Sequence, residues 1–144
     1  MASRDKDIED AVIATLTADS VFTGVNVDSR KLLVLRQNES VPRIMLKCVY
    51  DRAYAGDSEF PINAFYILTI RLVDRNSKAI TGTETLKEWR GRILQLLYGP
   101  SLSGASFVDD IRPVRPQRSA MPQMPEGVDS EAVAFEVETY EGLT

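Results

Sequence analysis

The sequence predicts a single α+β domain, a mostly antiparallel sheet with two helices packed on one of its faces. Apolar residues recur at helical spacing in segments 8–16 and 86–97, whereas segments 62–73 and 131–140 alternate as strands do. The helices are not interleaved one per strand, which favours the α+β class. A length of 144 residues is typical of one domain, and we expect residues 1–144 to form it.

The first predicted helix begins near the N-terminus. Its apolar positions share one face, and acidic residues crowd its first turns, where the positive end of the helix dipole favours them. We expect it to end near Asp19, before Gly24, and a first short strand to follow at 31–36. The apolar positions are Ile8, Ala11, Val12 and Leu16, and the acidic ones are Asp5, Asp7, Glu9 and Asp10.

Two longer segments predict a pair of strands. Segment 43–50 alternates and places Cys48 on an apolar face, while segment 62–73 is rich in aromatic and branched residues. The even positions of 62–73 are expected in the core, and its other face is half-polar, as in an antiparallel sheet covered on one side. Segment 51–61 is polar and contains glycine, which predicts a connecting loop at the tip of a long hairpin.

The second predicted helix carries a start signal and a stop signal. Thr81 and Glu84 have the spacing of a capping box, in which each side chain satisfies the backbone N–H of the other residue. Gly99 followed by Pro100 predicts the C-terminal end. The apolar face consists of Leu86, Trp89, Ile93, Leu96 and Leu97.

The composition changes in segment 100–127, which holds five of the seven prolines. Within it, 107–114 predicts a strand anchored by Ile111, whereas 116–127 has no periodicity and predicts an extended arm or long loop. The last predicted strand, 131–140, alternates cleanly. Its inward positions are Val133, Phe135 and Val137, and its outward positions include Glu136 and Glu138.

The inventory of residue types argues against catalysis. The chain has no histidine and one cysteine, so it lacks the residues for zinc clusters and for nucleophiles activated by histidine. Cys48 is expected to be a small core residue, and no glycine-rich phosphate loop follows a strand. We predict a protein that is not an enzyme and needs no cofactor or metal. The alternative is a small enzyme with paired carboxylates, such as Glu136 and Glu138 on one strand face.

The net charge and the charge distribution of the chain argue against some classes of partner. The formal net charge of −4 argues against a protein whose main task is gripping nucleic acid, and it would suit a surface along which DNA slides without sticking. The N-terminus is charged from Arg4, and no apolar run approaches the roughly 18 residues of a membrane span. The sequence therefore predicts neither a secretory signal nor a membrane segment.

The most informative pattern is the arginine-proline segment at 112–118. Arginine recurs at every third position, and in polyproline II, with three residues per turn, Arg112, Arg115 and Arg118 would line one edge. Such a rigid basic edge predicts docking on an acidic neighbour, a second copy of the chain included, or contact with nucleic-acid phosphates. We hypothesise that it pairs with an acidic loop of an adjacent subunit. The acidic residues of that loop are Asp51, Asp57 and Glu59.

The order of these elements carries a resemblance to a known family. A short acidic amphipathic helix comes first, then the strand pair 43–50 and 62–73, then a crossing helix at 81–98, and then a strand that ends in Phe135 to Tyr140. This order resembles the tail terminator (tail-completion) proteins of tailed bacteriophages. The resemblance covers most of the chain and rests on element order, size and patterning.

The resemblance implies a homo-hexameric ring that caps the tail tube, halts its polymerisation and joins it to a head-side connector or stopper protein. Such a ring would surround DNA without binding it specifically, and the family has no catalytic residues. It implies a protein of the virion tail or neck, assembled in the host cytoplasm. Two alternatives stay open: another neck or tail component (connector, stopper or tube-like subunit), and a cytoplasmic binding adaptor that uses the Arg-Pro arm.

Overall fold

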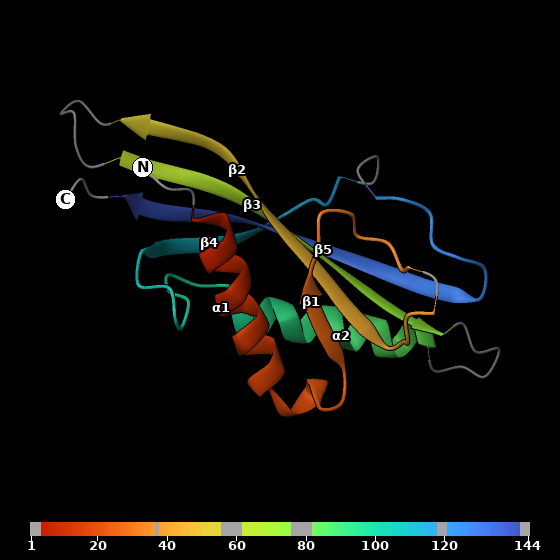
Figure 1. Cartoon of the computed structure of the whole chain (residues 1–144). Helices are drawn as coiled ribbons and strands as arrows, with labels where there is room; N and C mark the ends of the chain where they lie inside the picture. The colour runs from red at the N-terminus through yellow and green to blue at the C-terminus, as the bar shows by residue number, and fades with distance from the viewer. Residues whose placement is uncertain (1–3, 37, 56–61, 76–81, 118–120, 142–144) are drawn as a thin grey trace.

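The computed structural model describes residues 4–36, 38–55, 62–75, 82–117 and 121–141. In chain order its elements are α1 (Asp5–Ala18), the short 3-10 helix η1 (Ser20–Phe22), β1 (Asn26–Ser29), β2 (Arg43–Ala55), β3 (Ile62–Arg75), α2 (Gly82–Leu97), β4 (Val108–Val114) and β5 (Val128–Glu141). Figure 1 shows the three long strands β2, β3 and β5 running together, with their left-hand ends extending beyond α1.

The five strands form one sheet in the order β1-β2-β3-β5-β4. β1 pairs with β2 in parallel, and the other three pairings are antiparallel, which confirms the predicted mostly antiparallel sheet. β2 is longer than predicted: it continues through a bulge between Tyr50 and Arg52 as far as Ala55. Residues 51–55 are therefore strand and not loop, because residues 52–55 pair with residues 62–65 of β3 and Asp51 stands at the bulge.

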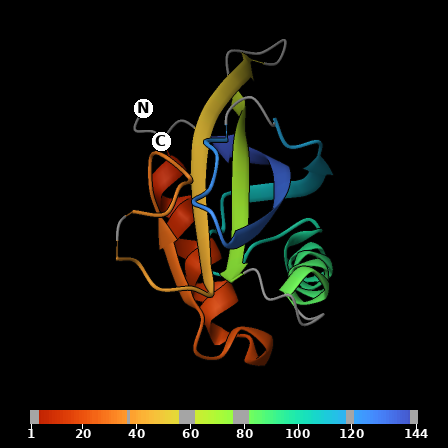
Figure 2. The same cartoon turned by 90° about the vertical axis from the view of Figure 1, so that its right-hand side faces the viewer.

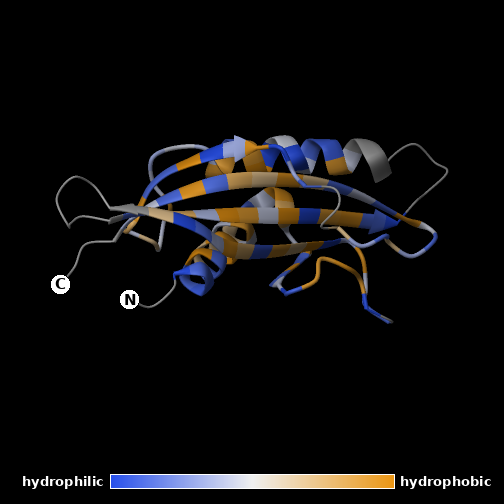
Figure 3. Cartoon of the chain, turned by 90° about the horizontal axis from the view of Figure 1, so that it is seen from above, coloured by the Kyte–Doolittle hydropathy of each residue, from blue (hydrophilic) through white to orange (hydrophobic). Residues whose placement is uncertain are grey.

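Both helices pack on the same face of the sheet, as predicted. α1 lies against β1 and β2, and α2 lies against β3 and β5. In Figure 2 this places α1 on the left beside β1 and β2, and α2 on the right. The strands alternate between hydrophilic and hydrophobic residues along their length, as Figure 3 shows, so each presents one apolar side to the helices.

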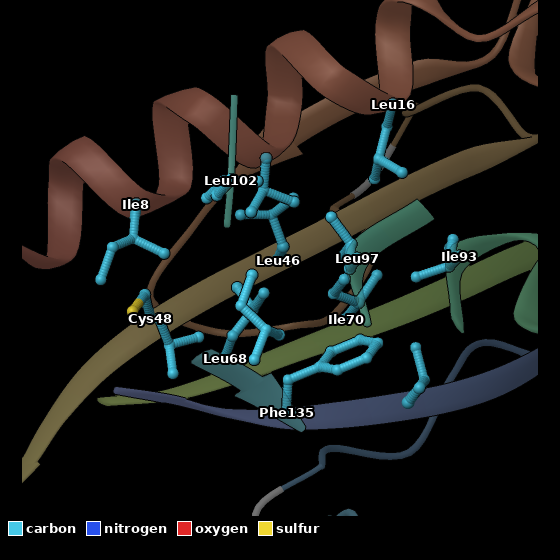
Figure 4. Packing of buried hydrophobic residues seen from close by; sticks show 14 of the residues in the cluster. Ile8, Leu16, Leu46, Cys48, Leu68, Ile70, Ile93, Leu97, Leu102 and Phe135 are labelled. Carbon is cyan, nitrogen blue, oxygen red and sulfur yellow. The ribbon is translucent and has the colours of Figure 1, made fainter. Parts of the chain in front are cut away.

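The main core fills the space between the helices and this inner face of the sheet. In Figure 4, Ile8 and Leu16 from α1 face Leu46, Leu68 and Phe135 from the strands, with α2 side chains closing the cluster. The predicted even positions of β3 are buried wherever their side chains are described, and the predicted inward positions of β5 are buried too. Cys48 is also a buried member of this core.

A second, smaller apolar cluster lies on the opposite side of the sheet, which we call the outer face. Leu33, Met45 and Val73 are buried there, and Met124 and Val128 pack against them. Two connecting segments, 30–42 and 121–128, therefore cover one end of the outer face. The prediction of an extended arm or loop in 116–127 agrees with this irregular chain, which lies against the sheet where it is described.

The predicted first strand at 31–36 is wrong, because this stretch has no strand pairing. The first strand is β1, which precedes it and pairs with the beginning of β2. β1 was missed because its sequence, Asn-Val-Asp-Ser, has little strand character of its own. Of its apolar residues, Leu33 is buried against the outer face, Leu35 packs beside this cluster, and Leu32 is exposed.

An ion-pair network anchored by Arg30 fixes this segment in place. The side chain of Arg30 is 7% exposed and binds Asp28 at 2.7 Å, Glu39 at 2.7 Å and the carbonyl oxygen of Val34 at 3.0 Å. Arg43 joins Asp28 at 2.7 Å. The Arg30 guanidinium lowers the pKa of Glu39 to about 2, so the carboxylate stays ionised. These bonds hold 30–39 in a compact loop over β1 and oppose an extended strand.

The second helix and the strand that follows it agree with the prediction. α2 ends at Leu97, and Gly99, at φ +147°, exchanges two backbone hydrogen bonds of 2.8 and 3.2 Å with Ile111 of β4. This positive φ explains why glycine stands there. The predicted capping box of Thr81 and Glu84 lies outside the residues whose side chains the structure describes.

We expect Leu68→Ala to lower the free energy of unfolding by about 2–5 kcal/mol, because Leu68 is fully buried and its removal leaves a cavity. The matched control is Leu32→Ala, since Leu32 is 62% exposed, and its effect should stay within about 0.5 kcal/mol. Urea denaturation followed by circular dichroism measures both variants. Equal losses for the two would contradict the described core.

Candidate functional site

The uncovered part of the outer face is the candidate site. On this face the long strands and β4 present side chains that alternate with the core positions, and the helices lie on the other side. Beyond the small cluster around Leu33, the face has two parts: a groove, and next to it a group of charged residues. We call these the outer groove and the ion-pair cluster.

The ion-pair cluster joins three strands through arginine and glutamate. Arg112 of β4 binds Glu136 of β5 at 2.7 Å, Glu138 at 3.3 Å and Asp110 at 2.5 Å. Arg52 of β2 reaches Glu136 from the other side at 3.2 Å. Hydrogen bonds from Arg112 are the main reason that the pKa of Glu136 lies below its usual value.

The strand register explains why these side chains meet. Arg112 pairs directly with Glu136, while Phe65 of β3 pairs with Glu138 on one side and Arg52 on the other. Opposite charges at such cross-strand positions attract. The guanidinium carbon of Arg52 also lies 4.4 Å from the centre of the Phe65 ring, and that of Arg112 lies 5.8 Å from it. The cluster therefore clamps β2, β3, β5 and β4 together on the side away from the core.

The predicted arginine edge is only partly present. Arg112 lies in β4, in pleated strand and not in polyproline II, and its guanidinium is held by carboxylates of its own chain. Arg112 thus belongs to the strand predicted at 107–114 and not to the polyproline II edge predicted at 112–118. Arg115 follows β4 and is exposed. Arg118 lies outside the described residues.

The acidic counterpart is likewise described in part. Asp51 is exposed on β2 and pairs with its neighbour Arg52. Asp57 and Glu59 lie outside the described part of the chain. Asp51 and Arg115 line the same groove, so one member of each predicted group is brought to a common surface within one chain.

The outer groove is an open hollow of about 400 Å³ beside the ion-pair cluster. Its floor is apolar, and its rim carries charges of both signs. Apolar lining residues include Val49, Ile67, Val114, Met121 and Ala134, and polar lining residues include Lys47, Asp51, Thr69, Arg115 and Gln117. A depression of this composition suits an apolar side chain of a partner, with polar groups at the edge to fix its orientation.

The neighbouring edge of β2 is partly open. β1 pairs with β2 only as far as Leu46. The next step along this edge is covered by Glu9 of α1, whose carboxylate accepts a 2.8 Å hydrogen bond from the backbone N–H of Cys48. Burial raises the pKa of Glu9. Beyond it, Val49 and Tyr50 are each about half exposed. This stretch can accept a further strand from another chain.

Several of these functional side chains were not predicted. Glu9 looks in the sequence like any acidic residue of a helix first turn, and Arg52 was assigned to a loop. Glu136 and Glu138 were placed correctly on the outward side, but their arginine partners are distant in sequence. A pairing of charges across strands becomes visible only when the register is known.

Three observations on the described residues concern groups that catalysis commonly uses. They contain no group of three or more His, Cys, Asp or Glu that could hold a metal ion. Burial raises the pKa of the Cys48 thiol far above neutrality, so the thiolate is scarce. Glu136, which was considered as one of a catalytic carboxylate pair, is kept ionised by two arginines, and this environment is unsuited to a general acid.

Comparisons with known proteins found no family model and no curated protein that matches the chain. Within the described ranges, no helix is both long enough and apolar enough to cross a membrane.

We expect Arg112→Gln to raise the pKa of Glu136 toward the ordinary value of 4.5, because the largest cause of its lowering is lost. Since the folded pKa is depressed, the pairing stabilises the protein above pH 4.5 and this stabilisation disappears as the pH falls through the folded pKa. Because the paired side chains are partly exposed to solvent, the variant should lose at most about 1 kcal/mol of the free energy of unfolding at pH 7. Carboxyl-carbon NMR titration measures the pKa. Arg115→Gln is the control and should leave Glu136 unchanged; an unchanged titration in Arg112→Gln contradicts the described cluster.

Cys48 should react with a thiol reagent only when the protein opens. The thiol is 4% exposed and its pKa is raised by burial, so both access and thiolate are limiting. In an Ellman assay at pH 8 we expect labelling of the native protein to be at least about a hundredfold slower than in urea, because it requires unfolding of a core strand. Labelling at the same rate in both conditions would place Cys48 outside the core.

Proposed function

We propose that this chain is a virion structural protein of the head–tail junction of tailed bacteriophages. In this role it forms a ring, a homo-hexamer in the resemblance stated above, which caps the tail tube, stops its polymerisation and joins it to the head-side connector. In this role the chain binds other proteins and does not catalyse a reaction. The observation that carries the proposal is the order of elements around a long β2–β3 hairpin.

The element order supports the proposal because it matches the one on which the resemblance rests. A short acidic helix is followed by the hairpin, a second helix on the same face of the sheet, and two closing strands. The hairpin strands are 13 and 14 residues long, and in Figure 1 their ends extend beyond α1. The position of the first strand, at Asn26–Ser29, differs from the predicted one without changing this order.

The surface of the subunit suits head-to-tail association. The outer groove and the open edge of β2 lie side by side, since Val49 and Tyr50 belong to both the edge strand and the groove lining. When one surface of a subunit binds a different surface of the next copy, the copies form a closed ring if the rotation from one copy to the next adds up to a full turn. The rigid clamp of the ion-pair cluster would hold this surface in one shape.

Charge supports the placement around DNA. The chain carries a formal net charge of −4, and Arg52 and Arg112 of the outer face are held by a carboxylate of the same chain. A ring of such subunits would repel the DNA backbone and let it slide. The occupied state of Arg112 weighs against the alternative adaptor, in which that arginine would have to bind a separate partner.

Mass photometry of the purified chain tests the ring directly. We expect a species with six times the subunit mass, alone or after mixing with the tail tube protein of the same virion. Val49→Asp should shift the distribution to monomers by about tenfold or more, because it buries a charge at the proposed contact. Val21→Asp is the matched control, since Val21 is 45% exposed on η1, away from this surface.

Two results would count against the proposal. A wild-type chain that stays monomeric under all of these conditions would exclude a ring. A ring that survives Val49→Asp, with circular dichroism unchanged, would place the subunit contact elsewhere. The Val21→Asp variant separates a specific effect from a general loss of folding.

A further inference from the structure

Arg71 stands apart from the other arginines of the described chain. It projects from β3 to the outer face and is only 6% exposed. Arg30 is similarly buried, but Asp28 and Glu39 neutralise it. No ion pair to a carboxylate is found for Arg71 among the described residues. A buried guanidinium without a counter-charge is costly, so its presence requires an explanation.

The hydrogen bonds of Arg71 leave one edge of the guanidinium open. Nη1 donates to the carbonyl oxygens of Leu33 at 2.8 Å and Pro122 at 2.5 Å, which uses both of its hydrogens. Nη2 donates to the hydroxyl oxygen of Ser130 at 3.3 Å, a long bond. Nε is buried and has no hydrogen-bond partner. The Nε–Nη2 edge is the fork with which arginine holds an oxyanion through two parallel bonds.

A large cavity lies beside Arg71, which is one of its lining residues. Its volume is about 940 Å³, and it forms where the chain leaves β4 after Val114, so that the beginning of β5 has no β4 partner. Arg71, Arg115 and Ser130 line it, together with Arg90 and Glu131, which bind each other at 3.2 Å. Segment 121–123 closes one side.

We propose that this cavity binds a phosphate dianion. Nη2 of Arg71 and the hydroxyl of Ser130 each donate a hydrogen bond to it, and the exposed guanidinium of Arg115 turns in from the rim. Binding supplies the counter-charge that Arg71 lacks among the described residues. The proposal concerns the isolated chain and is independent of ring formation.

Charge favours phosphate over a carboxylate and over a nucleic-acid strand. Arg90 and Glu131 cancel, so the lining leaves two positive charges, those of Arg71 and Arg115. Inorganic phosphate or a phosphate monoester carries between one and two negative charges near neutral pH and neutralises both, whereas a carboxylate neutralises one. A nucleic-acid strand offers singly charged diesters in a long polyanion, which the net charge of −4 repels.

Isothermal titration of the purified chain with inorganic phosphate tests the proposal. Chloride and acetate at equal ionic strength, and a single-stranded oligonucleotide, are the competing probes. We expect saturable binding of phosphate with one site per chain, and binding of acetate that is at least about tenfold weaker. Arg115→Gln should weaken phosphate binding about tenfold through the loss of a charged donor. Arg36→Gln, an exposed arginine outside the cavity, should leave it unchanged.

Two further variants keep the test decisive. Arg71→Lys keeps the charge but loses Nη2, and we expect phosphate binding to fall by more than tenfold. Since Arg71 also holds two carbonyl oxygens, its folding is checked by circular dichroism, and Ser130→Ala, at an exposed position, provides the second variant with an expected several-fold loss. Three results would each overturn the proposal. The first is that phosphate binds no more tightly than chloride, and the second is that the Arg115 and Arg36 variants bind phosphate equally well. The third is that the chain binds the oligonucleotide but not phosphate.

Discussion

The register of β3 against its two neighbours determines the rest of the structure. Every residue of β3 has a partner in β5, and β2 covers its other edge from Arg43 to Ala55. A slip by one residue would move Leu68 and Ile70 to the outer face and Thr69 and Arg71 into the core between sheet and helices. The same register sets Arg112 against Glu136 and leaves Arg71 under the segment 121–123. Core, clamp and cavity are thus consequences of one alignment.

The parts of the fold that were predicted are those encoded by local periodicity. Helical spacing marks the buried side of the helices around Leu16 and Ile93, and alternation marks the buried side of 62–73 and 131–140. These buried sides are the ones that pack against each other in the core. β1 was not predicted, because it forms through its pairing with β2 and its residues have little strand propensity of their own. At 31–36 the opposite happened: the apolar character of Leu33 indicated a strand, but Leu33 belongs to a loop that covers the outer face.

The candidate site was harder to predict than the fold, for a physical reason. Its interactions join residues far apart in the chain: Arg112 with Glu136, Arg52 with the same carboxylate, and Arg71 with the carbonyl oxygen of Pro122. Spacing in the sequence carries no record of such contacts. The spacing of the arginines predicted pairing with a neighbouring subunit, whereas the structure shows carboxylate partners of Arg112 within the same chain.

The central proposal is that this chain ends a tail tube by forming a ring that caps it. Electron microscopy of tail tubes grown from purified tube protein, with and without this chain, tests it most directly. The account predicts that added chain shortens the tubes in proportion to its concentration and appears as a ring at one end only. Tubes of unchanged length with bare ends, or chain incorporated along their whole length, would contradict it.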